Sequence, residues 1–203
     1  MTAIIFAFVG HDREGYYINN GRSSRWHNAP KKLITVLNSM SASQIKQLFG
    51  GTGGRFFIEG QAQNSNRTSD LDSHSGFELQ KIRWHAFGAG QSEWLSLLTP
   101  SGHVFNKIPD SLKEKIEKIG AGYIWTVSIG VDDAWAMTLG ATHLEWENVP
   151  PNLHEKLKSG RVIRNIVLSP WDWEHWWIEY GNGDTDFSLP QNWTDDINSI
   201  RHK

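Results

Sequence analysis

The stretch that decides the fold is residues 123–157, which read YIWTVSIGVDDAWAMTLGATHLEWENVPPNLHEKL. Apolar and polar residues alternate from 123 to 129, a polar turn follows at 130–134, and a second run begins at Trp135, as in a β-hairpin. A third short strand is expected over residues 143–149. Pro150 then precedes Leu153 and Leu157, whose spacing of four predicts a helix of two to three turns. The segment therefore predicts a unit of two or three strands and one short helix.

The same pattern recurs along the whole chain. Six apolar or proline positions of residues 81–121 return forty-one positions later, and these are Trp84, Trp94, Phe105, Pro109, Leu112 and Ile116. A first copy carries Trp26, Pro30, Leu33 and Leu37, and a last copy carries Trp176, Phe187, Pro190, Trp193 and Ile197. A second copy keeps only its hairpin, and its residues 64–75 lack the Pro and the Leu pair and are expected to form an exposed loop. We predict five repeats: 3–42, 43–80 (degenerate), 81–121, 122–162 and 163–203.

One such unit cannot bury its apolar face alone, so the copies must stack in a single domain spanning residues 1–203. The fold class is a β-rich repeat protein with short helices. An open solenoid needs polar terminal caps, whereas the first repeat keeps Ile4, Ile5 and Phe6 and the last keeps Trp176 and Trp177. We therefore favour a closed, five-bladed, propeller-like ring, with the open solenoid as the alternative.

The composition narrows the function classes. With 20 basic and 22 acidic residues the net charge is -2, which gives no basic stripe for a phosphate backbone, so nucleic acid is not an expected partner. The chain has no cysteine, and its nine histidines do not fall in a metal-binding spacing, so no metal site is expected. No glycine-rich loop leads from a strand into a helix, so no nucleotide cofactor is expected. The N-terminal apolar run is too short for a signal peptide or a membrane span, and we expect a cytoplasmic protein with no membrane partner.

The chain carries eleven tryptophans, and most recur at apolar positions of the repeat. Eight are expected in the core, namely Trp26, Trp84, Trp94, Trp125, Trp135, Trp146, Trp176 and Trp193. Trp171 and Trp173 lie instead in a turn that also contains Asp172 and Glu174. An indole beside carboxylates suits a sugar or an organic cation, so this turn is one candidate site, and a simple solvated turn is the alternative.

A second candidate site comes from the first strand of each repeat. One face of this strand is apolar in all copies, while the other varies. If the first strand is innermost, the varied face converges on the axis and places five residues at one level, namely Phe6, Lys46, His85, Thr126 and Asn165. That set predicts a mixed central pocket. The alternative is that this face is the outer, wetted one.

Three functions remain open. The first is a small-ligand-binding protein, possibly lectin-like, with one aromatic-lined site per chain and a small molecule or carbohydrate as partner. One site is expected because the apolar frame repeats while both candidate sites vary between copies. The second is a cofactor-independent enzyme with Lys46 and His85 as acid and base. The third is a scaffold that binds another protein. Nothing in the sequence indicates an oligomeric state.

Overall fold

The computed structural model describes residues 4–62, 65–69, 81–140 and 142–201. These residues form five three-stranded antiparallel sheets, each with its strands in chain order. Sheet 1 consists of β1 (Ile5–Gly10), β2 (Glu14–Asn19) and β3 (Ser24–His27), and sheet 2 of β4 (Ile45–Gly50), β5 (Phe56–Ala62) and β6 (Ser65–Ser69). Sheet 3 consists of β7 (Ile82–Phe87), β8 (Trp94–Leu98) and β9 (His103–Asn106), sheet 4 of β10 (Ile124–Ile129), β11 (Trp135–Leu139) and β12 (His143–Glu147), and sheet 5 of β13 (Ile163–Leu168), β14 (Trp176–Tyr180) and β15 (Thr185–Ser188).

A helix follows four of the five sheets. The helices are α1 (Lys31–Asn38), α2 (Asp110–Ile119), α3 (Pro151–Leu157) and α4 (Gln191–Arg201). The predicted repeat of strands and a short helix is thus confirmed, and the third strand is present in every sheet. The expectation of a loop at 64–75 was wrong for Ser65–Ser69, because this segment pairs with β5. Residues 70–80 lie outside the described residues.

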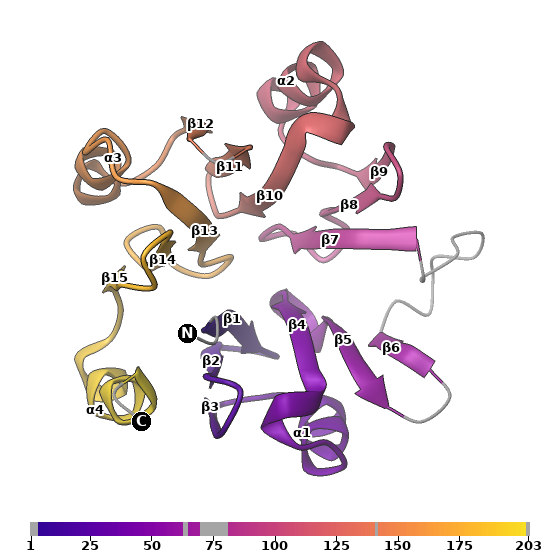
Figure 1. Ribbon diagram of the computed structural model, residues 1–203, viewed down its shortest axis with the longest axis vertical. Coiled ribbons are helices and arrows are strands. Elements are labelled where there is room, and N and C mark those ends of the chain that lie inside the picture. The colour runs from indigo at the N-terminus through magenta and orange to yellow at the C-terminus, as the bar shows by residue number, and fades with distance from the viewer. Residues whose placement is uncertain (1–3, 63–64, 70–80, 141, 202–203) are drawn as a thin grey trace. The chain divides into compact units, whose positions relative to one another are not determined.

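The chain divides into two compact parts. The first part comprises residues 1–80 and 190–203, and the second comprises residues 81–189. Both parts are built from the same sheet-and-helix unit, as Figure 1 shows for α1 beside β4 in the first part and for α2 and α3 in the second. The prediction of one closed ring is not tested by either part alone.

Within each part, a helix packs against the sheet that follows it in the chain. Leu33 and Leu37 of α1 share one apolar cluster with Leu48 and Phe56 of sheet 2. In the same way α2 shares a cluster with sheet 4, and α3 shares one with sheet 5. Each of these helices starts after a proline, whose fixed φ suits the first turn. We call each such contact a junction.

The last helix makes a junction with the first sheet, inside the first compact part. The ring of Trp193 in α4 lies 4.9 Å from that of Tyr16 in β2, measured between centroids. The Tyr16 hydroxyl donates to Asp196 at 2.9 Å, and the Asn20 side chain donates to the carbonyl of Ile200 at 2.8 Å. Sheet 1 therefore packs against α4 in the same way as sheets 2, 4 and 5 pack against the helices that precede them in the chain.

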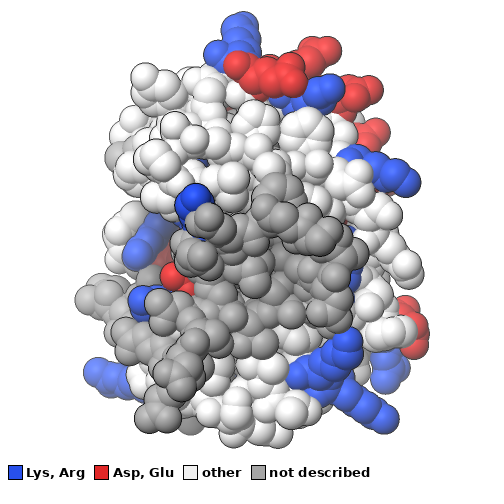
Figure 2. Space-filling view, turned by 90° about the vertical axis from the view of Figure 1, so that its right-hand side faces the viewer, with Lys and Arg blue, Asp and Glu red and all other residues white. Residues whose placement is uncertain are grey.

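Three junctions carry an ion pair at the same place in the repeat. Lys115 of α2 lies 2.9 Å from Glu145, and Lys156 of α3 lies 2.6 Å from Asp186. The hydrogen bond from Lys115 lowers the pKa of Glu145, and the hydrogen bond to Asp186 raises the pKa of Lys156. At the α4 junction the polarity is reversed, because Asp196 is on the helix and Arg25 on the sheet, 3.5 Å apart. Over α2 acidic and basic side chains are interspersed, at the top of Figure 2.

A β-bulge interrupts the first strand of sheets 2 to 5. The register shifts fall between Ile45 and Gln47, Ile82 and Trp84, Ile124 and Thr126, and Ile163 and Asn165. A bulge leaves one residue unpaired and breaks the alternation of faces. Trp125 is the bulged residue of sheet 4 and is 53% exposed, so the expectation that it belongs to the core was wrong.

The other expected core tryptophans are buried or packed on the core. Trp94, Trp135, Trp176 and Trp193 are buried, and Trp26, Trp84 and Trp146 pack against the apolar clusters from the edge. Trp177, which had no core assignment, is fully buried as well. No helix within the described ranges is long and apolar enough to cross a membrane.

Candidate functional site

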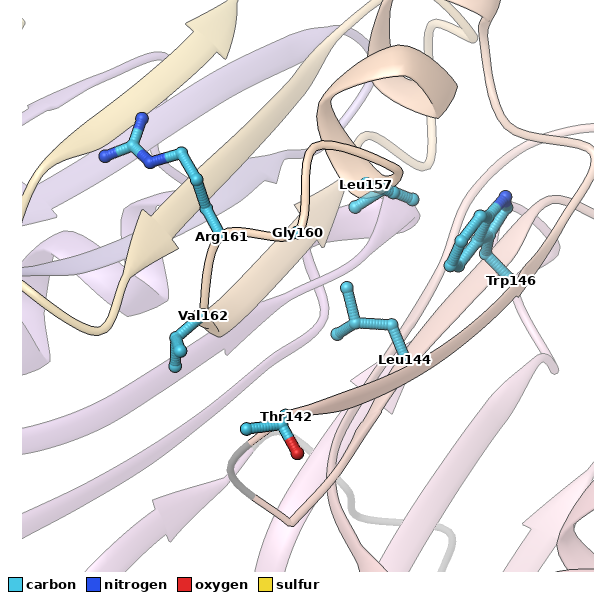
Figure 3. Close-up of a pocket in the computed structure, with 7 residues that line it drawn as sticks. All are labelled: Thr142, Leu144, Trp146, Leu157, Gly160, Arg161 and Val162. Carbon is cyan, nitrogen blue, oxygen red and sulfur yellow. The ribbon is translucent and has the colours of Figure 1, made fainter.

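A pocket opens at the junction of α3 with sheet 5, inside the second compact part. Its volume is about 490 Å³ when the open mouth is counted, and it is lined by Thr142, Leu144, Trp146, Leu157, Gly160, Arg161 and Val162. Leu144 points toward Leu157, and the indole of Trp146 lies beside them (Figure 3). The residues come from β12, from the end of α3 and from the connection into β13. Sheet 4 and the next helix thus form the apolar wall, and the connection forms the mouth.

The pocket is lined in part by a glycine, at a position where three other copies of the repeat carry a large apolar residue. Ten residues after the helix-leading proline, the other junctions place a large apolar residue, which is Met40 after Pro30, Ile119 after Pro109 and Ile200 after Pro190. Met40 and Ile119 pack against the apolar clusters, and Ile200 is buried. The position ten residues after Pro150 is Gly160, and a Cβ added there would meet no atom within 4 Å.

The connection at this junction is also shorter than at the two comparable ones. Seven residues separate Leu37 from Ile45 and Ile116 from Ile124, whereas five separate Leu157 from Ile163. The two longer connections contain the 3-10 turns η1 (Ala42–Gln44) and η4 (Ala121–Tyr123). The short connection runs straight into β13 with Gly160 at φ 72°, a backbone conformation that glycine adopts at little cost.

The polar groups around the pocket are held by partners within the protein. The guanidinium of Arg161 lies 3.5 Å from the centroid of the Tyr180 ring and 2.8 Å from Asp184, and it points away from Leu144 and Leu157 in Figure 3. The Trp146 Nε1–H donates to His154 Nδ1 at 3.0 Å. Burial raises the pKa of Tyr180. Thr142, at the mouth, supplies the remaining side-chain hydroxyl among the lining residues.

The turn with the two predicted tryptophans lies at the opposite end of β13. Trp173 is 38% exposed, and its Nε1–H donates to the carbonyl of Asn148 at 2.8 Å. Trp171 is half-buried, and its backbone N–H donates to the Ser169 hydroxyl at 3.0 Å. Asp172 is exposed beside them. The turn therefore presents one indole face with carboxylates nearby, as the sequence indicated.

The five first-strand candidates fall at four different places in the register. Counted from the first pair of each hairpin ladder, His85 lies in the third pair, opposite Ser96, whereas Thr126 and Asn165 lie in the fourth, opposite Thr138 and Glu179. Phe6 lies in the fifth pair, opposite Ile18. Lys46 is the bulged residue of sheet 2 and is exposed. His85 and Thr126 differ because the turn of sheet 3 spans residues 88–93, one residue more than the turn of sheet 4 at 130–134.

Their surroundings differ as well. Phe6 is buried against Phe8, with ring centroids 5.1 Å apart. His85 is fully buried, and its Nδ1 lies 2.8 Å from the hydroxyl of Ser96, while Thr126 and Thr138 share a buried hydrogen bond of 2.8 Å. Asn165 lies opposite Glu179, whose carboxylate is 3.5 Å from Arg164. Phe6 and Lys46 belong to the first compact part and the other three to the second, so their convergence stays a prediction.

No metal-binding cluster of three His, Asp or Glu side chains occurs among the residues that the structure describes. Sequence reasoning missed the pocket beside Gly160, although one signal was present: a glycine ten residues after the proline, where three other repeats have Met or Ile. No family model, no curated protein and no solved structure matches the chain.

Proposed function

We propose that the protein binds a small ligand at one aromatic-lined site per chain, the pocket between β12, the end of α3 and the connection at residues 160–162. The observation that carries this proposal is the pocket itself, in which the indole of Trp146 lies beside Leu144 and Leu157 and Gly160 adds no side chain. A cavity lined by an indole and two aliphatic side chains is a place where a small molecule can bury part of its apolar surface.

The chemistry of the lining supports the same proposal. Leu144, Leu157 and Trp146 offer apolar surface that is already in place, so a ligand orders few side chains on binding. Burial of apolar surface contributes about 25 cal/mol per Å², so even a small inserted group gains useful affinity. Because the pocket is half open, we expect weak to moderate affinity.

A thermal-shift screen with a metabolite library and a sugar panel tests this proposal. Wild type, Leu144→Phe and Trp173→Ala are compared. Leu144→Phe places a larger ring in the pocket, so we expect ligand-dependent shifts to disappear there and to persist in Trp173→Ala. The reverse pattern, or no ligand in wild type, contradicts a site at the pocket.

A carbohydrate site at the turn of Trp171 and Trp173 is the second candidate. It is favoured by the exposed indole of Trp173, which is held in place by its hydrogen bond to Asn148. Loss of sugar binding in Trp173→Ala alone would move the function to this turn and support the lectin-like alternative. Catalysis by Lys46 and His85 has less support, since His85 is fully buried and engaged with Ser96.

We also propose that the five repeats close into a ring. The support is that α4, the last element, makes with sheet 1 the same kind of junction that α1, α2 and α3 make with the sheets after them. Small-angle scattering tests closure: a compact protein of this length has a radius of gyration of about 17 Å. A markedly larger value would favour the open solenoid.

A further inference from the structure

The Trp146 indole at the wall of the pocket is held by a hydrogen bond to α3. Its Nε1–H donates to Nδ1 of His154 at 3.0 Å, and the two rings stand at 79° to each other with their centroids 5.8 Å apart. Both side chains are partly buried. The indole nitrogen is turned away from Leu144 in Figure 3, so this bond keeps the apolar part of the ring beside Leu144 and Leu157.

The direction of the bond fixes the protonation state of His154. An indole N–H can only donate, so Nδ1 of His154 accepts, and the neutral ring carries its proton on Nε2. A protonated imidazole has an N–H on both nitrogens and cannot accept from Trp146 at either of them. Histidine is the ordinary side chain that changes its charge between about pH 5 and pH 8. The bond therefore exists only while His154 is neutral.

The preceding repeat makes the corresponding contact without a histidine. Lys113 of α2 lies over the Phe105 ring of β9, with Nζ 5.9 Å from the ring centroid. These two residues stand forty-one positions before His154 and Trp146. A contact between an ammonium and a phenyl ring needs no acceptor atom, and lysine side chains stay protonated where histidine titrates. Of these two ring contacts, the one at the pocket is the one that depends on pH.

The charged groups around His154 lie on α3 and on the two sheets packed against it. Lys158 follows His154 by one helical turn on the same face, and its charge disfavours a second positive charge there. Glu145 and Glu147 alternate with Trp146 along β12, so they lie on the other face of the strand. Among the residues that the structure describes, no carboxylate forms an ion pair with His154, so protonation gains no partner in return for the indole. The remaining charged groups are the exposed Glu155 and the pairs Lys156–Asp186, Arg161–Asp184 and Arg164–Glu179.

We infer that His154 is a pH-sensitive switch for the wall of the pocket: the neutral ring holds the Trp146 indole in place, and the protonated ring releases it. A partly buried indole N–H that loses its acceptor has to reach water, so the ring turns and changes the surface that it presents to Leu144 and Leu157. Because a released ring no longer offers a fixed apolar surface, ligand binding weakens on acidification. The change at Trp146 requires no ligand, and only its consequence for binding rests on the proposed function.

NMR spectra of the full chain test the switch, recorded without ligand between about pH 8 and pH 5. We expect the proton signal of the Trp146 indole N–H to move upfield as the pH falls, with the same midpoint as the ring signals of His154. The methyl signals of Leu144 and Leu157 should follow with that midpoint. A Trp146 signal that does not follow His154, or methyl signals that stay in place, overturns the inference and leaves ligand binding at the pocket intact.

Three variants and one internal reference provide the controls. His154→Asn offers a side-chain oxygen that does not titrate, so the Trp146 signal should keep its high-pH position throughout. His154→Leu offers no acceptor, so the signal should keep its low-pH position throughout. In His143→Asn, which removes the histidine of β12, the titration should persist, and the indole signal of Trp135, which donates to Ser111, should not move in any sample. Loss of the titration in His143→Asn, or its persistence in either His154 variant, overturns the inference.

Discussion

The junctions of α2 with sheet 4 and of α3 with sheet 5 differ in one short connection. In both, a proline precedes the helix and two aliphatic residues of the helix are buried. In both, an indole N–H of the sheet donates to a side chain of the helix: Trp135 to Ser111 at 3.0 Å, and Trp176 to Asn152 at 3.2 Å. The first junction then continues with Ile119 and a 3-10 turn, and the second with Gly160 and no turn. The comparison teaches that the helix and the following sheet pack in the same way whichever connection joins them, so a pocket can be present at the connection without loss of the fold.

The largest expected effect on stability comes from a side chain that is buried between a helix and a sheet. Trp135 is almost fully buried at the filled junction, so Trp135→Ala should lower the free energy of unfolding by about 3–5 kcal/mol, as large-to-small core changes do. Trp146→Ala, at the half-buried edge of the open junction, should cost about 1–2 kcal/mol, because less apolar surface is lost. Urea unfolding of both variants measures the difference. Equal losses of stability in the two variants would contradict the distinction between a core position and a position at the edge of the pocket.

The next largest effect on stability concerns the residue ten positions after the proline that precedes each helix. Ile200 is buried at the α4 junction, and Ile200→Ala should cost about 2–4 kcal/mol. Gly160→Ala removes no contact and adds a Cβ in open space, so it should cost only about 1 kcal/mol, from the positive φ of 72°. Chemical denaturation decides this prediction, and a Gly160→Ala loss as large as that of Ile200→Ala would mean that the glycine position is tightly packed.

High pH should weaken the first compact part through its two tyrosines of raised pKa. Burial raises the pKa of Tyr17 to about 12, and burial followed by the hydrogen bond to Asp196 raises the pKa of Tyr16 further. The neutral phenols are favoured by folding, so their contribution is complete below pH 10 and is lost as the pH rises through the folded-state values. Urea midpoints measured from pH 8 to pH 12 should fall above pH 10, and less steeply in Tyr16→Phe. A slope that Tyr16→Phe leaves unchanged would exclude this tyrosine as the cause.

The reversed ion pair should give the smallest effect. Arg25 and Asp196 are each about half exposed, and such pairs contribute about 0.2–1 kcal/mol. Arg25→Ala should therefore lower the stability by no more than about 1 kcal/mol, and added salt should remove the difference. Lys156→Ala, at the pair of opposite polarity, is the matched control. A salt-independent loss would assign the effect to packing of the arginine stem instead.

The sequence predicted the frame because each apolar position recurs in several copies. Trp135, Leu153 and Leu157 read as core from the repeat alone, and the structure buries them. The alternation rule failed for Trp125 because a bulge adds one residue to β10, and no local feature of a single strand reveals such an insertion. Thr126 and His85 differ by one pair in the register because the hairpin turn of sheet 3 is one residue longer than that of sheet 4.

The candidate site was less predictable than the frame. The exposure of Trp173 was predicted because its turn is polar in the sequence, whereas its hydrogen bond to Asn148 was not predicted. Gly160 was overlooked because glycine after a helix is an ordinary ending, and it stands out only when it is aligned with Met40, Ile119 and Ile200 by distance from the preceding proline. An absent side chain carries no signal in a search for reactive residues.

A crystal structure of the wild-type protein under xenon pressure tests the central claim most directly, since xenon enters apolar cavities that protein atoms leave open. The account predicts xenon between Leu144, Leu157 and Trp146 at the α3 junction, and none beside Met40, Ile119 or Ile200. An empty α3 junction, or equal occupancy at the other three junctions, would contradict the claim that the α3 junction is open to a ligand.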